Sequence, residues 1–272
     1  MSKPDLYPEI IYKYRDWKDI HHKNVLIENQ LYLSSPSLFN DPFDCRIPID
    51  YRHLNTKEKI ERFAHGFIDR HQDYIADNGF SHKEEFDKLV YDLTNDFEAF
   101  QTKHENQLFS MQDIHYGVLS MSTKWNNILM WTHYADLHRG VCYGFWEVKL
   151  RESDLFGKGG PVGYDPDNTF PFINPFEENK MIKGFIETHN KANEWNYENE
   201  YRLFKLFFPD VPSKGDRIKR IPNDFFAEIV LGIMVPDDHK KEIVEKAKKK
   251  GIKIYQAVKV PFQFKIDRKE IL

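Results

Sequence analysis

The sequence predicts an α+β fold in which a helical hairpin is inserted into a β-rich core. Short runs of β-branched and aromatic residues, which are typical of strands, occupy both ends of the 272-residue chain. Between them, apolar residues recur at helical spacing. This order favours an α+β protein over a regular βαβ alternation. We expect a single domain over residues 1–272, with the β-rich core at 1–50 and 112–272 and the helical insertion at about 52–111.

The N-terminal part of the core is expected to hold two strands and one helix. Residues 9–15 (EIIYKYR) and 31–35 (LYLSS) have the composition of strands, and residues 16–29 between them predict a short helix. A loop follows at 36–45, because the residue before Pro42 is disfavoured in helical conformation.

The insertion is expected to form two helices, at 57–74 and 83–108, separated by a turn at 76–79. Both segments carry apolar residues three and four positions apart, as on one face of a helix. Their polar faces are expected to be solvated surface, and a lid or a partner-binding face is the alternative.

The rest of the chain is expected to return to strands. These lie at 116–122, 140–146, 200–208, 228–234 and 252–260. Helices are expected at 126–134, 180–194 and 237–250, with an irregular connection rich in Gly, Pro and Asp at 156–176. The helix at 237–250 has a lysine-rich end that suits the helix dipole, and Gly251 ends it.

Composition excludes several classes of protein. The net charge of -4 gives no overall signal for nucleic-acid binding. With only two cysteines, Cys45 and Cys142, the chain is no disulfide scaffold and fits a reducing compartment. The polar start at residues 1–5 shows no secretory signal, and no apolar run approaches the ~18–20 residues of a membrane span. We therefore expect a cytoplasmic protein that does not bind membranes.

The most informative candidate site is the pair Glu198 and Glu200, in the segment WNYENEYRLF. Residues two apart on a strand point to the same face, so these carboxylates are expected side by side at a strand mouth. Like charges held close are costly unless something cationic or catalytic uses them. The alternative is a solvated strand edge with Arg202 as a third group on that face.

Two further groups of residues are candidates for ligand binding. Tyr14 and Arg15 end the first expected strand together with Lys13, where a cation and aromatic rings can hold a phosphate or a base. Asn40 and Asp44 lie in a dense turn that can position a ligand. The alternatives are an ordinary surface strand end and a turn that caps itself.

The densest polar and aromatic cluster runs from residue 120 to 140. Its candidates are Ser122, Trp131, His133 and Tyr134. His133 and His138 are five apart, which is poor spacing for a metal pair on one helix face, so no metal site is expected. The chain also lacks the nucleophile elbow of serine hydrolases and the glycine-rich phosphate motifs.

Four blocks together resemble the bacterial family called domain of unknown function 2971. They are YKYR at 12–15, LYLSSPSLFNDPFDC at 31–45, LSMSTKWNNILMWTHYADLHRGVCYGF at 119–145 and WNYENEYRLF at 195–204. The chain is also distantly similar to the ADP-ribosyltransferase superfamily, especially its DarT-type members. That resemblance implies a split β-sheet core and NAD as the substrate. The chain departs from the pattern in lacking a clean Ser-Thr-Ser and in offering two glutamates.

The ADP-ribosyltransferase resemblance also implies roles for the candidate residues. Glu200 would be catalytic, with Glu198 assisting or orienting the acceptor, and Arg15 would pair with a phosphate of NAD. Trp131 or Tyr134 would stack on nicotinamide or adenine, and Ser122 would fill the middle-strand position. His133 would bind ribose or be a core histidine, while Asn40 and Asp44 would anchor the loop that flanks the pocket.

Three functions therefore remain open. The first is an NAD-dependent ADP-ribosyltransferase or NAD glycohydrolase, a bacterial toxin or antiviral defence effector with an antitoxin or other partner, whose acceptor is DNA, RNA, protein or water. The second is a non-catalytic module that binds a nucleotide or a partner. The third is a nuclease that uses Mg²⁺ and the carboxylates of Asp41, Asp44, Asp136, Glu198 and Glu200.

Overall fold

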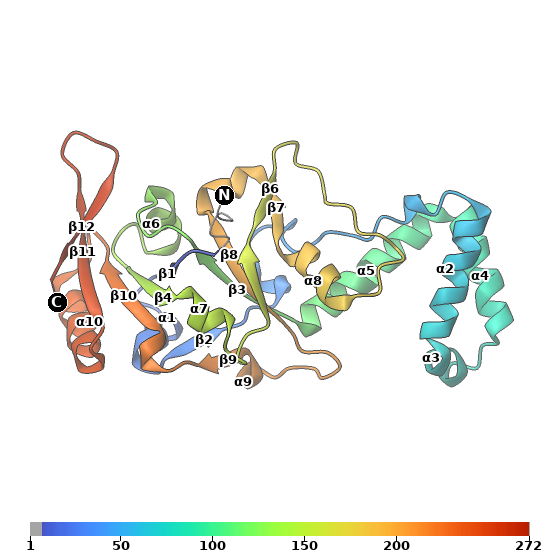
Figure 1. The fold of residues 1–272 in the computed structure, drawn as a ribbon, viewed down its shortest axis with the longest axis horizontal. Coiled ribbons are helices and arrows are strands. Elements are labelled where there is room, and N and C mark those ends of the chain that lie inside the picture. Colours follow the sequence, from blue (N-terminus) through green and yellow to red (C-terminus); the bar gives the residue numbers. More distant parts are fainter. Residues whose placement is uncertain (1–6, 272) are drawn as a thin grey trace, which may run out of the picture.

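The computed structural model describes residues 7–271 and shows a mixed α+β fold (Figure 1). Its main feature is an eight-stranded sheet in the order β12-β11-β10-β4-β1-β3-β8-β5. Neighbouring strands are antiparallel except for β10 and β11, which are parallel. The predicted α+β class is confirmed. The expectation about the polar start of the chain concerns residues that lie outside this described part.

The strands of the large sheet are β1 (Ile10–Arg15), β3 (Tyr116–Ser122), β4 (Val141–Trp146), β5 (Lys158–Pro161), β8 (Glu200–Leu206), β10 (Phe226–Leu231), β11 (Lys253–Lys259) and β12 (Ile266–Glu270). Two small ladders accompany it. One joins β2 (Gln30–Tyr32) to β9 (Ile218–Arg220), and the other joins β6 (Gly163–Asp165) to β7 (Asn190–Ala192).

The α-helices are α1 (Ile20–Ile27), α2 (Lys57–Arg70), α3 (Gln72–Asp77), α4 (His82–Asn95), α5 (Phe97–His115), α6 (Ile128–Tyr134), α7 (Glu147–Arg151), α8 (Lys180–Thr188), α9 (Lys214–Arg217) and α10 (Asp237–Lys250). Short 3₁₀ helices are η1 (Pro36–Leu38), η2 (Tyr51–His53), η3 (Asn193–Glu198) and η4 (Asn223–Phe225).

Alternation along the strands gives the sheet two buried faces. Ile11 and Tyr143 point to one face, in the same hydrophobic cluster as Leu26 of α1 and Ala247 of α10. Tyr14 points the other way and packs with residues of α6. Successive side chains of a strand alternate between faces, so a mixed aromatic strand such as β1 buries residues on both sides.

The sheet opens between β1 and β3. These strands share one register pair, Tyr12 with Ser122. Further along β3, the neighbour is Ser34, whose backbone exchanges two hydrogen bonds of 2.8 Å with Val118. Strand β3 therefore pairs with β1 at one end and with Ser34 further along. Between these two points a gap remains beside β1.

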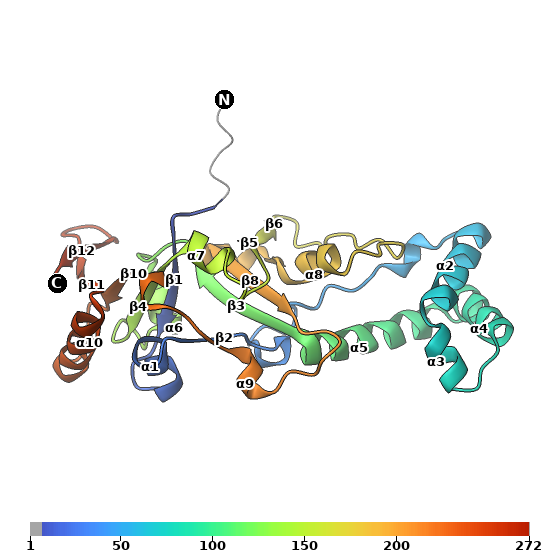
Figure 2. The ribbon, with the colours of Figure 1, turned by 60° about the horizontal axis from the view of Figure 1, so that its bottom comes forward.

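The helical insertion builds a second hydrophobic cluster away from the sheet. Figures 1 and 2 show α2, α3 and α4 at one end of the molecule, joined to the sheet by α5. Buried members of the cluster include Phe63 of α2, Leu93 of α4 and Phe100 of α5. Ile173, from the long connection before α8, completes it. The block therefore rests on its own core.

The insertion differs in detail from the predicted two-helix hairpin. A short helix, α3, follows α2, and the second predicted helix is broken between α4 and α5. Asp96 at the break has φ -138° and ψ 48°, outside the helical region. Asn95 and Asp96 compete for backbone hydrogen bonds with their short side chains, which weakens a helix there. Helix α5 then continues directly into β3.

The connection predicted to be irregular, at 156–176, contains β5 and β6. Its glycines allow the close approach of β8: a Cβ at Gly159 would lie 2.5 Å from Leu203 Cδ2. The helix predicted at 180–194 ends at Thr188 as α8, and β7 follows it. Strand β12, the outer edge of the sheet, was not predicted.

Candidate functional site

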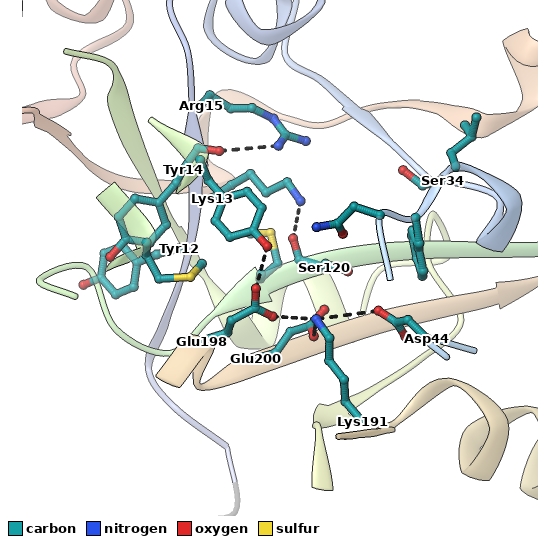
Figure 3. Close-up of a pocket in the computed structure, with 16 residues that line it drawn as sticks. Tyr12, Lys13, Tyr14, Arg15, Ser34, Asp44, Ser120, Lys191, Glu198 and Glu200 are labelled. Atoms are coloured by element: carbon teal, nitrogen blue, oxygen red, sulfur yellow. Dashed lines mark hydrogen bonds and ion pairs between the residues drawn. The ribbon is translucent and has the colours of Figure 1, made fainter. Parts of the chain in front are cut away.

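A cavity of about 260 Å³ lies at the opening between β1 and β3 (Figure 3). It is lined by all four residues at the end of β1, by parts of β3 and α6, and by the segments before and after η1. The lining residues are Tyr12, Lys13, Tyr14, Arg15, Ser34, Leu38, Phe39, Asn40, Asp44, Ser120, Met121, Met130, Tyr134, Lys191, Glu198 and Glu200. We call this space the cleft.

One wall of the cleft carries two cations from β1. Lys13 Nζ donates a hydrogen bond to the backbone carbonyl of Ser120, across the gap that strand pairing leaves open. Arg15 Nη1 lies 3.4 Å from the carbonyl of Tyr14, and its Nε has no hydrogen-bond partner. Neither cation forms an ion pair with a carboxylate of residues 7–271.

Burial weakens the protonated forms of both cations. It lowers the pKa of Lys13 well below its usual value, and the nearby charge of Arg15 lowers it further. Burial also lowers the pKa of Arg15 to about 10. An anion in the cleft would restore the missing counter-charge, so this wall is suited to phosphate or another anionic group.

The position of Arg15 depends on a glycine in the neighbouring loop. A Cβ at Gly140 would lie 2.2 Å from the carbonyl oxygen of Arg15, so a larger residue cannot pass the end of β1 there. Val141 then pairs with Arg15 as β4 begins. The glycine therefore lets the loop before β4 pass close to the backbone at the end of β1, where Arg15 lies.

The opposite wall carries Glu198 and Glu200, which are 3% and 5% exposed. They are brought together, but not as two residues of one strand as predicted. Glu198 ends η3, and Glu200 begins β8. Asn199 between them has φ 45° and ψ 51°, a left-handed conformation that asparagine tolerates better than most residues.

Both carboxylate oxygens of Glu200 accept hydrogen bonds from Arg202. Arg202 Nε and Nη2 lie 2.7 and 2.9 Å from the two carboxylate oxygens of Glu200, and its Nη1 and Nη2 lie 2.8 and 2.7 Å from those of Asp44. Burial alone would raise the pKa of Glu200, but the charges of Arg202 and Lys191 outweigh it and lower the pKa to about 2. Arg202 is 0% exposed, which excludes the solvated strand edge considered for this face.

Glu198 is held by two different groups. Tyr134 donates a hydrogen bond of 2.6 Å to its Oε1, and Lys191 Nζ lies 2.7 Å from its Oε2. The same ammonium lies 3.4 Å from Glu200 and 3.6 Å from Asp44 (Figure 3). Lys191 therefore lies at the centre of three carboxylates, and Glu198 is the one that Arg202 does not bind among the described contacts.

The structure brings seven of the ten candidate residues to the cleft: Tyr14, Arg15, Asn40, Asp44, Tyr134, Glu198 and Glu200. Three lie elsewhere. Ser122 is buried and donates to the carbonyl of Glu198 at 2.7 Å, so it supports the site through the backbone. His133 is exposed beside the ring of Tyr197.

Of the two rings expected to stack on a ligand, Trp131 or Tyr134, the structure excludes Trp131. It is 0% exposed, its Nε1 donates to the carbonyl of Trp125 at 2.8 Å, and its ring packs edge-on against Tyr14. The tryptophan therefore packs behind Tyr14, which lines the cleft, and does not line the cleft itself. Lys191 is the central charged residue of the site that sequence reasoning missed, since nothing in its surroundings distinguishes it from other lysines of the chain.

The carboxylates of the site are arranged around cations of the protein itself. Asp44, Glu198 and Glu200 converge on Lys191 and Arg202. Asp136, which the nuclease hypothesis requires, pairs instead with Lys18 at 2.7 Å. Among residues 7–271 no group of three His, Cys, Asp or Glu side chains is placed to hold a metal ion.

The fold and the cleft define an α+β protein with a buried charge cluster at an opening in its sheet. The model of the family described as "Protein of unknown function (DUF2971)" matches residues 130–203. Over this stretch the chain is similar to that family, which agrees with the resemblance of the sequence blocks. The matched stretch includes Tyr134, Lys191, Glu198 and Glu200, and it ends just after Arg202.

No curated protein and no solved structure matches the chain. Within residues 7–271, no helix combines the length and the apolar character needed to cross a membrane.

Proposed function

We propose that the cleft binds NAD and that the protein is an NAD-dependent ADP-ribosyltransferase or NAD glycohydrolase. One observation carries this proposal: an opening between two strands has unpaired cations on one wall and carboxylates on the other. NAD has the matching chemistry, with an anionic pyrophosphate and a ribose whose reaction develops positive charge.

The reaction breaks the bond between the ribose carbon and the nicotinamide nitrogen, and the bond electrons leave with neutral nicotinamide. The ribose passes through an oxocarbenium-like state, as in glycoside hydrolysis, and a carboxylate stabilises that charge. Water or an acceptor then bonds to the same carbon and loses a proton. The products are nicotinamide, the ADP-ribosyl product and a proton.

The contacts favour Glu198 over Glu200 for direct contact with the ribose. Both oxygens of Glu200 accept hydrogen bonds from Arg202, so this carboxylate is fixed by the protein. Glu198 is held by a phenol and an ammonium at the cavity wall. In this arrangement Glu200 is a positioning residue that keeps Lys191 and Arg202 in place.

Arg15 and Lys13 would bind the pyrophosphate. The cleft of about 260 Å³ is smaller than most pockets that enclose a whole cofactor, which have about 300–1,000 Å³. We therefore place the nicotinamide ribose and the adjoining phosphate inside the cleft, with the adenosine half extending from its mouth beside Asn40 and Leu38.

A non-catalytic nucleotide-binding module is the second candidate. The observation that favours it is the neutralisation of all three carboxylates by Lys191 and Arg202. A module of this kind would bind NAD or a related nucleotide without breaking it. Action as a toxin or antiviral defence effector, with an antitoxin as partner, remains part of the first proposal.

The test combines NAD binding by calorimetry with release of nicotinamide by the purified protein. We expect Glu198→Gln to lower the release rate at least a hundredfold while NAD binding changes little, because the lost charge acts in the transition state. We expect Arg15→Gln to weaken NAD binding about tenfold or more, since a charge-assisted contact is lost. Lys214→Gln, an exposed change on α9, is the control.

Binding without release would establish the module. A protein that does not bind NAD, or a Glu198→Gln variant with full activity, would contradict the first proposal. Growth of cells that express the protein or its Glu198→Gln variant tests toxicity, and only the former is expected to inhibit growth.

A further inference from the structure

The hairpin between β11 and β12 ends in two fully exposed phenylalanines. Phe262 and Phe264 are the most exposed large apolar side chains of the described residues, at 107% and 102%. A backbone hydrogen bond of 3.0 Å, from Val260 to the carbonyl of Lys265, closes the hairpin behind them. Removing apolar surface from water is favourable, so this pair of rings, which we call the tip, is suited to contact with a partner.

The end of the molecule that carries the tip is positively charged. Residues 237–270 hold 11 Lys or Arg and only 6 Asp or Glu, whereas the whole chain holds 39 and 43. Lys259 and Lys265 flank the tip, and both are exposed. A partner is therefore expected to offer an apolar surface with negative charge around it.

A surface with these properties lies on the same protein, at a second cavity of about 580 Å³ that shares Lys191 with the cleft. It is formed by the turn after η1, the connection after β6, and the segment from β7 into η3. Its apolar walls come from Phe43, Ile47, Phe170, Pro171 and Trp195. Phe43 and Phe170 are 64% and 52% exposed, so these walls are open to solvent.

The surroundings of the second cavity are negatively charged. The connection at 161–179, which forms one wall, holds four carboxylates and no lysine or arginine. Asp165 of this connection and Glu194 of η3 line the cavity and are exposed. Lys191 Nζ lies 2.7 Å from Glu198 on the side of the cleft, so its charge is already matched there. The second cavity therefore complements the tip in both apolar character and charge.

The tip and the second cavity of one chain lie far apart. Strand β12 forms one edge of the eight-stranded sheet, and β5, which leads directly into β6, forms the other edge. Figures 1 and 2 both show the hairpin of β11 and β12 at the end of the molecule opposite the helical block, away from β6. The tip can therefore reach a second cavity only on another copy of the chain.

We propose that the tip of one copy enters the second cavity of another copy, so that the chain associates with itself head to tail. This contact is heterologous, so an assembly either closes into a ring or continues to grow. The two phenylalanines would bury about 300–500 Å² of their own surface, less than the ~800 Å² per partner of a standard interface. We therefore expect weak, reversible association, which does not depend on the proposed NAD chemistry.

Sedimentation velocity at protein concentrations up to about 1 mM measures this association. We expect the average sedimentation coefficient to rise with concentration, and to rise less at high salt, because screened charges attract weakly. Two variants remove one side of the contact each. The tip variant combines Phe262→Asn with Phe264→Ser, since asparagine tolerates the left-handed backbone at Phe262, where φ is 61°. The cavity variant, Phe170→Lys, places a cation in the apolar wall.

We expect each variant alone to associate at least tenfold more weakly than the wild type. In an equimolar mixture, the intact cavity of the tip variant meets the intact tip of the cavity variant. We expect this mixture to form a one-to-one complex with the affinity of the wild-type contact and nothing larger. The complex would also show that both variants are folded. Phe80→Ser, at an exposed phenylalanine between α3 and α4, is the control and should associate like the wild type.

Three results would overturn the proposal: a wild-type chain that stays monomeric up to about 1 mM, a cavity variant with full association, or a mixture that forms no complex. Full association of the cavity variant would point to contact between two tips or two sheet edges. Vesicles of phosphatidylcholine and phosphatidylglycerol and a single-stranded oligonucleotide are further probes. Binding of either by a monomeric wild type, lost in the tip variant, would assign the tip to a membrane surface or to nucleic acid instead.

Discussion

The hydroxyl of Tyr134 lies 2.6 Å from Oε1 of Glu198, and this contact joins α6 to the end of η3 across 64 positions of the chain. Burial and the hydrogen bond to Glu198 raise the pKa of Tyr134, so the phenol remains a donor at neutral pH. A second bond between these segments, from Asn127 to the carbonyl of Tyr197, fixes their relative position. The glutamate is thus oriented by residues far from it in sequence.

Replacing Tyr134 by phenylalanine tests this orientation. We expect kcat for nicotinamide release to fall about tenfold, because a hydrogen bond to a charged group contributes about 1.5–3 kcal/mol. KM should stay unchanged, since the wall with Lys13 and Arg15 is untouched. Tyr91→Phe, at an exposed tyrosine of α4, is the control. A Tyr134→Phe variant with full kcat would show that the contact has no role in the proposed reaction.

The buried arginine of β8 is expected to dominate stability near the cleft. Arg202→Met leaves Asp44 and Glu200 without their bidentate partner in the protein interior. Breaking one side of such a buried network costs about 3–5 kcal/mol, and lysine cannot replace the two forked contacts. Urea denaturation followed by circular dichroism measures the loss.

The control for this prediction is Arg52→Lys, at an exposed pair with Asp50, which should leave the urea midpoint unchanged. Equal midpoints for Arg202→Met and the wild type would contradict the assigned role of Arg202.

Acidification is expected to weaken the fold through buried histidines. Burial, reinforced by the charge of Arg202, lowers the pKa of His189 to about 4. Below about pH 6.5 this histidine is protonated in the unfolded chain and still neutral in the folded chain. The free energy of unfolding therefore falls as pH drops from 7 toward 4.5. The slope for one such group is about 1.4 kcal/mol per pH unit.

His104, whose pKa burial lowers to about 4, adds the same effect in the helical block. Urea titrations at several pH values should show a shallower slope for His189→Gln than for the wild type. The remainder is expected from His104 and from the other histidines whose pKa burial lowers, His22 and His138. An unchanged slope in this variant would assign the acid sensitivity to other groups.

The helical block is expected to unfold separately from the sheet. Phe63 is 5% exposed and packs edge-on against Tyr51 and Phe100. Phe63→Ala should cost the block about 3–5 kcal/mol. Hydrogen exchange should then accelerate in α2 and α4, while β4 and β10 keep their protection. Phe80→Ala, at a half-exposed position, is the control, and uniform acceleration over both regions would contradict separate cores.

Local patterns were sufficient for the elements with strong signals. The strand predicted at 9–15 is β1 from Ile10 to Arg15, and the helix predicted at 237–250 has the observed bounds of α10. In both elements the signal lies in the segment itself. Strand β1 is rich in β-branched and aromatic residues, and α10 has an acidic first turn, a lysine-rich last turn and a glycine after its end.

The features that were not predicted depend on tertiary contacts. Strand β5 consists of Lys158-Gly159-Gly160-Pro161, a sequence with little intrinsic preference for a strand. It is extended because it pairs with the edge of β8. The burial of Trp131 and the central place of Lys191 depend on how α6 and β7 pack, which no local spacing reports. Seven residues of the cleft were nevertheless among the candidates, since charged and aromatic clusters at strand ends are visible in the sequence.

The separate core of the helical block has a consequence for how this architecture can vary over time. The cleft is formed by β1, β3, α6, η3 and the turn near Asp44, and none of α2 to α5 lines it. Related proteins could have a longer, shorter or different helical block between η2 and β3 and still keep the residues that line the cleft. The insertion is thus a segment in which a new binding surface can arise without any change to the residues that line the cleft.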